Sequence, residues 1–277
     1  MKSGRGKRSG GGRNKRKSGR KKTEPKKQIQ KPEHIRLNKY ISHAGYCSRR
    51  DADKLIDAGK VTVNGKTVTE LGVSVSAGDE VVVEGQKISL ESFVYILLNK
   101  SANVISPTND ERDRKTVLDQ VEKATGNRVY PVGRLDRNTT GLLLLTNDGD
   151  LAHRLMHPSY KVNKTYSVES ERPLTDDELL SLKSGIELED GVAKAYNIQR
   201  SSDNPAVFKL SVHEGRNRLI RRMVEQFGTQ VKKLKRTDYA GLNLKGVRRG
   251  RWRYLKQGEV NQLRKLVQLE ALNFNKE

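Results

Sequence analysis

Four consecutive leucines, residues 142–145, stand between two groups of turn-forming residues at 138–141 and 147–149. An uninterrupted apolar run of this length is typical of a strand that is buried on both faces, at the centre of a sheet. The stretch that leads into this run holds one carboxylate, Asp136, between Arg134 and Arg137. A turn anchored by a buried strand is held rigidly, as functional sites need. Asp136 is therefore a candidate functional residue.

The first 33 residues carry 14 Lys and Arg against two acidic residues, a charge of +12 out of +22 for the whole chain of 277 residues. They contain almost no apolar side chains, so they cannot bury enough surface to offset the entropy of ordering. We expect residues 1–33 to be a disordered basic tail that contacts nucleic acid, since each cation on a phosphate releases counterions. The alternative is a tail that only adds solubility.

The rest of the composition indicates a soluble, cytoplasmic protein. No apolar run approaches the roughly 20 residues that span a bilayer, and the basic start is not followed by the apolar core of a secretory signal. Cys47 is the only cysteine, so no internal disulfide can form and a reducing compartment fits. At roughly 150 residues per domain, the length suggests two domains.

The first of these domains is predicted at residues 34–92. Apolar residues at helical spacing predict a helix over 36–44, and the pair Ser48 and Asp51 begins a second helix in a pattern like a capping box. Asn64-Gly65 between alternating β-branched residues predicts a hairpin over 61–68. A strand over 81–83 completes a small sheet, and residues 86–92 are predicted to be a linker.

Residues 93–277 are predicted to form the second domain, in which strands and helices are interspersed. The expected strands are 94–98, 129–132, 142–146, 164–168, 193–199, 207–212 and 229–234. The expected helices are 150–156, 176–183, 217–227 and 260–269. Such a pattern favours an α+β fold with a mixed or antiparallel sheet.

The first domain resembles the S4-type RNA-binding domain, a small module with an αL motif. The resemblance covers residues 35–82 and is carried by Arg36-Leu-Asn-Lys-Tyr-Ile, by Gly-Tyr-Cys-Ser-Arg-Arg-Asp-Ala at 45–52 and by Gly-Lys-Val-Thr-Val-Asn-Gly-Lys at 59–66. It implies that Arg49, Arg50 and Lys54 face RNA. The alternative is an ordinary solvated basic face.

The second domain resembles the pseudouridine synthases through three motifs in order. From position alone, Asp136 is equally explained as a turn residue or as a catalytic carboxylate. The stretch 133–150 around it is similar to the central motif of this family, and within the family to the RsuA/RluB group. The stretches 157–166 and 215–223 are similar to the second and third motifs. The resemblance implies the fold, a catalytic domain with a mixed or antiparallel sheet.

The resemblance also implies the roles of the site residues. Asp136 would be the nucleophile, Tyr166 would pack on the target base, and Arg221 would pair with the aspartate, favouring its ionised form and fixing its orientation. The base must be flipped out of its helix to be reached. The alternatives are a core role for Tyr166 and a phosphate contact for Arg221.

Three further arginines are assigned to RNA binding. Arg134 and Arg137 flank the nucleophile, and Arg222 is the preferred phosphate contact next to Arg221. No metal site is expected, because the histidines do not cluster and no cysteine pair exists. No cofactor is needed for the implied reaction.

Together these observations predict an isomerase that converts a specific uridine of ribosomal RNA to pseudouridine. The third motif, with Asn217-Arg218-Leu219, resembles the RluB branch, which points to large-subunit (23S) rather than small-subunit (16S) RNA. Free RNA or a pre-ribosomal particle would be the substrate, and the protein is expected to be a monomer. The alternatives are a ribosome-assembly or RNA-binding factor without chemistry, and an RNA glycosidase or lyase that leaves an abasic product.

Overall fold

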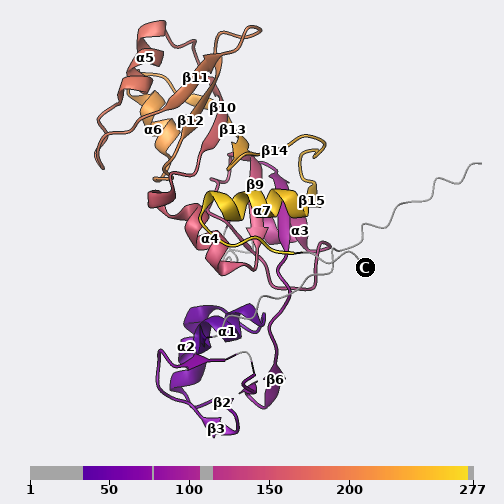
Figure 1. The fold of residues 1–277 in the computed structure, drawn as a ribbon. Coiled ribbons are helices and arrows are strands. Elements are labelled where there is room, and N and C mark those ends of the chain that lie inside the picture. The colour runs from indigo at the N-terminus through magenta and orange to yellow at the C-terminus, as the bar shows by residue number, and fades with distance from the viewer. Residues whose placement is uncertain (1–33, 77, 107–114, 274–277) are drawn as a thin grey trace, which may run out of the picture.

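The computed structural model describes residues 34–76, 78–106 and 115–273. The tail predicted at 1–33 lies outside these residues. Two units follow one another along the chain (Figure 1). The N-terminal unit runs from β1 to β6, and the larger C-terminal unit runs from β7 to α7. No helix in the described ranges is both long enough and apolar enough to cross a membrane.

The N-terminal unit packs two helices on short strands, as the sequence predicts. Its elements are β1 (Ile35–Arg36), α1 (Leu37–His43), α2 (Arg49–Asp57), β2 (Val61–Val63), β3 (Lys66–Thr67), β4 (Ser74–Val75), β5 (Val81–Val83) and β6 (Gln86–Ile88). The antiparallel sheet has the order β3-β2-β5-β6. Asn64 and Gly65 both have positive φ in the hairpin turn, and Ser48 caps α2. The predicted linker begins too early, because its first residues pair with β5 as β6.

The C-terminal unit is built on one large mixed sheet. Its strands are β7 (Tyr95–Lys100), β8 (Tyr130–Pro131), β9 (Thr140–Thr146), β10 (Lys164–Ser170), β11 (Tyr196–Arg200), β12 (Val207–Val212), β13 (Val231–Tyr239), β14 (Leu242–Asn243) and β15 (Trp252–Tyr254). The order is β11-β12-β10-β13-β9-β7-β15, with β14 beside β13 and β8 beside β9. Among the described strands only β9 and β13 pair in parallel, so the predicted mixed-sheet α+β class is confirmed.

Helices cover both faces of this sheet. They are α3 (Val117–Val121), α4 (Gly149–Met156), the 3-10 turn η1 (Pro158–Tyr160), α5 (Asp176–Ser184), α6 (Leu219–Glu225) and α7 (Gln257–Leu266). Buried residues of α3, α5 and α6 belong to one core, and those of α4 and α7 to the other. The sequence missed α3, β14 and β15, because elements this short carry no full period of apolar residues.

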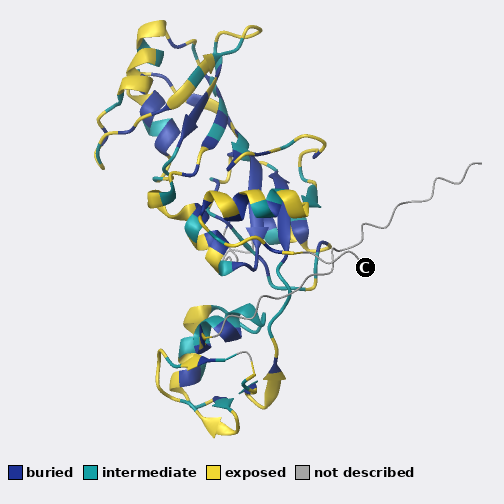
Figure 2. Cartoon of the chain, in the orientation of Figure 1, coloured by how far each residue is buried: buried dark blue, intermediate teal, exposed yellow. Residues whose placement is uncertain are grey.

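The leucine run is the centre of the sheet. Leu143 and Leu145 enter one core, while Leu142 and Leu144 enter the other, and all four are fully buried. Figure 2 shows the central strands as the most deeply buried part of the chain. Successive residues of a strand alternate between faces, so an uninterrupted apolar run is what a strand between two cores requires. The prediction from the run is confirmed.

A buried ion pair ties the last helix to this sheet. Asp148 caps α4 by accepting from the amide of Leu151, and it also accepts from the Tyr95 hydroxyl at 2.7 Å and from Arg264 Nη1 at 2.7 Å. Both charged side chains are almost completely buried. Removing one partner would leave an uncompensated buried charge, so this pair fixes where α7 docks.

Gly141 allows β9 to approach β13. Its φ is +105°, and a Cβ at this position would lie 2.2 Å from the carbonyl oxygen of Arg236. Arg236 is its register partner in the parallel pair. Any larger residue would push apart the two strands that frame the turn containing Asp136.

We expect Gly141→Ala to lower the free energy of unfolding by about 1–3 kcal/mol from the strained backbone and by about 1–3 kcal/mol more from the overlap with β13. Gly85→Ala is the matched control, because Gly85 also has positive φ (+83°) but has nothing within 4 Å of the place that a methyl group would take. Urea unfolding would measure both variants. Equal losses would show that close approach to β13 does not matter.

Candidate active site

A cavity of about 640 Å³ opens where the turn before β9, strand β10, the loop before α6 and strand β13 meet. Its walls include Asp136 and Arg134 from the turn, Tyr166 from β10, and Arg218 from the loop. An adjoining hollow of about 80 Å³ also contains Asp136 and Tyr166. The fold therefore brings together two of the three residues that the sequence assigns to the chemistry.

The turn that carries Asp136 is held through its backbone. The carbonyl oxygen of Asp136, not its carboxylate, accepts from the amide of Thr139 at 3.0 Å. Ser106 Oγ donates to the Leu135 carbonyl and accepts from the Leu135 amide. In the described part of the chain, the Asp136 carboxylate makes no hydrogen bond or ion pair. It is half-buried and lines the cavity.

Lys100, at the end of β7, fixes this turn by hydrogen bonds to its carbonyl oxygens. Its Nζ donates to the carbonyl oxygens of Asp136 (3.1 Å), Arg137 (3.2 Å) and Thr139 (2.8 Å), and to that of Ser101 (3.1 Å). Burial lowers the pKa of Lys100 to about 8, and the nearby Asp136 charge acts in the opposite direction. The sequence analysis gave Lys100 no role. A lysine that ends an apolar strand was the available signal, since lysine is almost never fully buried without a partner.

Strand β10 supplies the opposite wall. Its residues alternate in burial, which places Lys164 and Tyr166 on one face, both lining the cavity. Tyr166 is 9% exposed; it belongs to the core cluster and also lines the cavity. Lys164 donates to the carbonyl of His213 at 2.7 Å. Burial, followed by the nearby Arg236 charge, lowers the pKa of Lys164 to about 8.

Arg221 and Asp136 form no ion pair or hydrogen bond in the described structure. Arg221 lies on α6 and donates from Nη1 to the carbonyl of Val231 at 2.8 Å. Its pKa is lowered, chiefly by burial and then by Arg218, while Asp136 acts to raise it. The Arg221 Nε is buried with no acceptor among the described residues.

Arg236, which sequence analysis did not single out, also lines the cavity. It is 2% exposed, and its Nε donates to the carbonyl of Leu142 at 2.7 Å. Its guanidinium lies 4.8 Å from the ring centre of Tyr239. Its Nη2 is a second buried donor without an acceptor in the described residues. Arg236 thus places a buried positive charge in the wall of this cavity.

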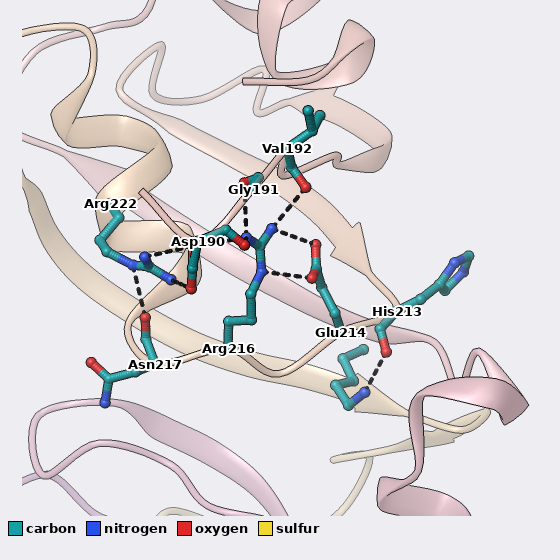
Figure 3. A network of polar contacts seen from close by, with 9 residues as sticks. Asp190, Gly191, Val192, His213, Glu214, Arg216, Asn217 and Arg222 are labelled. Carbon is teal, nitrogen blue, oxygen red and sulfur yellow. Dashed lines mark hydrogen bonds and ion pairs between the residues drawn. The ribbon is translucent and has the colours of Figure 1, made fainter. Parts of the chain in front are cut away.

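The third-motif loop is shaped by an acidic cluster (Figure 3). Arg216 binds Glu214 through Nε at 2.7 Å and Asp190 through Nη1 at 2.8 Å, and it also donates to the carbonyls of Gly191 and Val192. Asp190 is bound by Arg222 as well, through both of its oxygens. Hydrogen bonding from Arg222 is the main cause that holds the pKa of Asp190 below its usual range. Arg222, predicted to contact RNA, is therefore engaged within the protein.

This cluster presents Arg218 to the cavity. Arg218 lies in the left-handed region (φ 48°) just before α6, is exposed and lines the cavity wall. A non-glycine residue in this region is strained and is kept there by its surroundings. Here the surroundings are the bonds that fix Arg216 and Arg222 on either side.

The other predicted RNA contacts lie on the surface. Arg134 and Arg137 are exposed on the turn, but only Arg134 lines the cavity. Arg49, Arg50 and Lys54 are exposed on α2, where Lys54 pairs with Asp51 in the same helix. Burial is the main cause that raises the pKa of the cavity residue Tyr130 to about 12.

Side chains from both units join them. Lys39 of α1 pairs with Asp150 of α4 at 2.7 Å, and the His43 ring stacks on Phe93 with centres 4.6 Å apart. Arg128 donates to the carbonyl of Cys47 at 3.1 Å. Within the described ranges, no group of three or more His, Cys, Asp or Glu is arranged to hold a metal ion.

Known proteins match this chain across both units. It matches the RNA pseudouridylate synthase family over residues 94–226 and the S4 domain over residues 35–81. It is 48% identical over 238 residues to ribosomal large subunit pseudouridine synthase B of Bacillus subtilis, covering 84% of this chain and 96% of the relative.

Two further likenesses agree. The dual-specificity RNA pseudouridine synthase RluF of Escherichia coli is 40% identical over 237 residues, covering 84% of this chain and 80% of RluF. A crystal structure of a pseudouridylate synthase superposes with a TM-score of 0.60 and 28% identity, over 83% of this chain and 99% of that chain.

We expect Lys100→Met to lower the free energy of unfolding by about 3 kcal/mol, because three carbonyls of the turn lose a charged donor in a buried place. Lys233→Met is the control, since Lys233 is exposed and pairs with Glu169 on the surface; it should change stability by less than about 1 kcal/mol. Urea unfolding would compare them. An equal loss of unfolding free energy in both variants would show that Lys100 does not stabilise the turn that carries Asp136.

Proposed function

The chain belongs to the RNA pseudouridylate synthase family, and from this premise we propose that it isomerises a specific uridine of large-subunit (23S) ribosomal RNA, with Asp136 as the nucleophile. An RNA pseudouridine synthase with an S4 domain must bring one carboxylate to one flipped nucleotide. The observation that carries the assignment is the Asp136 carboxylate, which lines a nucleotide-sized cavity and is bound by no described protein group.

The reaction explains why this carboxylate is unoccupied. The N1–C1′ bond of uridine breaks, the uracil turns over, and C5 joins C1′; the hydrogen on C5 leaves as a proton and N1 gains a proton. A carboxylate can attack covalently or stabilise the sugar as the bond breaks. Either role needs an ionised oxygen that is free to meet substrate and a backbone that does not move. Lys100 and Ser106 supply the second condition through the turn carbonyls and amide.

The cavity walls suit a flipped uridine. Tyr166 offers a ring face for stacking, and Arg236 adds a positive charge to the wall. We infer from the third motif that Arg221 is the partner of Asp136 once substrate is bound; in this structure Arg221 binds the carbonyl of Val231. Arg134 and Arg218 on the rim would hold the backbone of the flipped nucleotide.

The S4 unit would deliver the RNA. Its exposed Arg49 and Arg50 lie on α2, and α1 of the same unit is joined to α4 of the catalytic unit by the Lys39–Asp150 ion pair. We take residues 34–92 as this RNA-binding domain, 93–277 as the catalytic domain and 1–33 as a tail that adds affinity for RNA. The name of the Bacillus subtilis relative supports the large subunit as the substrate. We further propose that the protein acts in the cytoplasm as a monomer, on free RNA or on a pre-ribosomal particle.

Tritium release tests the reaction and the residue together. Large-subunit RNA transcribed with 5-³H-uridine would lose tritium to water when C5 joins C1′, and its mass otherwise stays unchanged. Wild-type protein should release it, whereas Asp136→Asn should be slower by more than about 10³-fold with RNA affinity unchanged. Asp203→Asn, on an exposed loop, is the control.

A residual rate of Asp136→Asn within tenfold of wild type would contradict the nucleophile assignment. No release by wild type from free RNA or from ribosomal particles would favour the RNA-binding factor without chemistry. Small-subunit RNA is included as a second substrate, so that release from the two ribosomal RNAs can be compared.

Asp190→Asn should lower kcat about tenfold and leave KM within twofold. The amide keeps the size of the side chain but loses the charge that both Arg216 and Arg222 bind, so the loop that presents Arg218 loosens. Asp176→Asn is the matched control, because Asp176 pairs with one arginine at an exposed site. A rise in KM at constant kcat would show that Asp190 supports RNA binding instead of the shape of the site.

A further inference from the structure

The loop between β14 and β15 carries four exposed cations that the site does not use. Lys245, Arg248, Arg249 and Arg251 are all exposed, and none of them forms an ion pair within the described residues. Other cations of the domain, among them Arg172, Arg216 and Arg253, each bind a carboxylate. We call residues 245–251 the basic loop. Figure 2 shows it as an exposed excursion beyond β14.

The basic loop is held in one conformation by the end of β7. The amide of Gly250 donates to the carbonyl of Asn99 at 2.7 Å, and the Asn99 amide donates to the carbonyl of Arg251 at 3.0 Å. The Asn99 side chain, itself 6% exposed, donates to the carbonyl of Val247 at 2.8 Å. A loop anchored at three points loses little conformational entropy when it binds.

The same strand end also holds the catalytic turn. Lys100, the next residue, binds the carbonyls of Asp136 and Arg137. Trp252 of β15, the residue after Arg251, pairs with Leu98 of β7. On the other side of β7, Lys100 pairs with Gly141 of β9. Two strand spacings, about 10 Å, therefore separate the backbone of the basic loop from that of the strand leading out of the catalytic turn. Exposed Arg137 lies on this turn.

The chemistry of the loop indicates a polyanion. Its one large apolar residue, Val247, is buried in the core, and neighbouring Leu244 packs against the same core. The loop therefore offers cations without exposed apolar surface, which suits phosphates and does not suit an apolar protein groove or insertion into lipid. Cations that already bind carboxylates would gain little from phosphates; these four have no such partner in the described part of the chain.

We propose that the basic loop, continued by Arg137, binds the phosphate backbone of the RNA that flanks the target nucleotide. This proposal rests on the proposed function, because the RNA is that of the same reaction. Backbone contacts of this kind position an RNA without reading its sequence. The S4 domain and the basic loop would then hold the substrate at two separate places while Asp136 acts on one base.

The test compares Arg248→Gln/Arg249→Gln with Lys232→Gln/Lys233→Gln in the full chain. The control pair lies on β13, faces Glu169 and changes the net charge equally. Binding to an unmodified transcript of Bacillus subtilis large-subunit RNA would be measured between about 50 and 300 mM salt, with Asp136→Asn added so that no turnover occurs. For the loop variant, we expect the slope of log K against log salt to become shallower by about 1.5. For the control, the slope should stay within about 0.3 of that of the protein without either pair of substitutions.

Tritium release by the same pairs, with Asp136 intact, gives the second readout. The loop variant should raise KM about tenfold with kcat within twofold, and thermal unfolding should not change, because neither side chain has a charged partner among the described residues. Equal salt slopes in loop and control variants would overturn the proposal, as would a fall in kcat at constant KM.

Two more outcomes separate the alternatives. If the loop variant binds the transcript normally but fails on assembled large subunits, the partner is an acidic protein and the proposal is overturned. If wild-type protein releases no tritium while the loop variant still shows the shallower slope, the proposed reaction fails and the RNA-binding surface is supported.

Discussion

The end of β7 is the constraint on which the site depends. Lys100 is fully buried and replaces water for four carbonyl oxygens, three of them in the turn that holds Asp136. A buried ammonium is stable only when such acceptors surround it, so the lysine and the turn fix each other. Asn99 holds the basic loop by hydrogen bonds. Its backbone and side-chain amides donate to the carbonyls of Arg251 and Val247, and its carbonyl accepts from the amide of Gly250. One strand end thus sets the position of the nucleophile and of a nearby cationic surface.

The cationic side chains of the protein fall into two groups, those that bind carboxylates within the protein and those that do not. Arginines that shape the site, such as Arg216 and Arg222, are neutralised by Asp190 and Glu214, and they hold the loop that presents Arg218. Arg134 on the rim and the four cations of the basic loop have no carboxylate partner in the described structure, and all of them are exposed. Arg216 and Arg222, which lie in the loop and helix beside the cavity, are thus occupied by other carboxylates and not by Asp136.

Two sites of close backbone contact make the geometry possible. Gly141 lets β9 lie against β13, and the parallel pair that results brings Arg236 to the cavity wall. The left-handed backbone of Arg218 shapes the loop before α6, which reaches the cavity wall. Both are conformations that cost free energy. Arg218 lines the cavity, whereas Gly141 is buried where β9 meets β13.

Much of this protein follows from the sequence alone. Periods of two and about 3.6 residues located most of the strands and helices, and the leucine run identified the central strand, since local apolar patterns report burial directly. The three motifs named the family. The sequence also singled out Asp136 and Tyr166, which the fold brings to one cavity.

Tertiary structure alone decided the remaining features. Lys100 and Asn99 acquire their roles through residues between 36 and about 150 positions away, and Arg222 is diverted to Asp190, 32 residues distant. Short elements such as β15 exist only because β7 offers them an edge. Spacing along a chain encodes the local period of burial, but partners that are distant in sequence are fixed only when the sheet order brings their strands together.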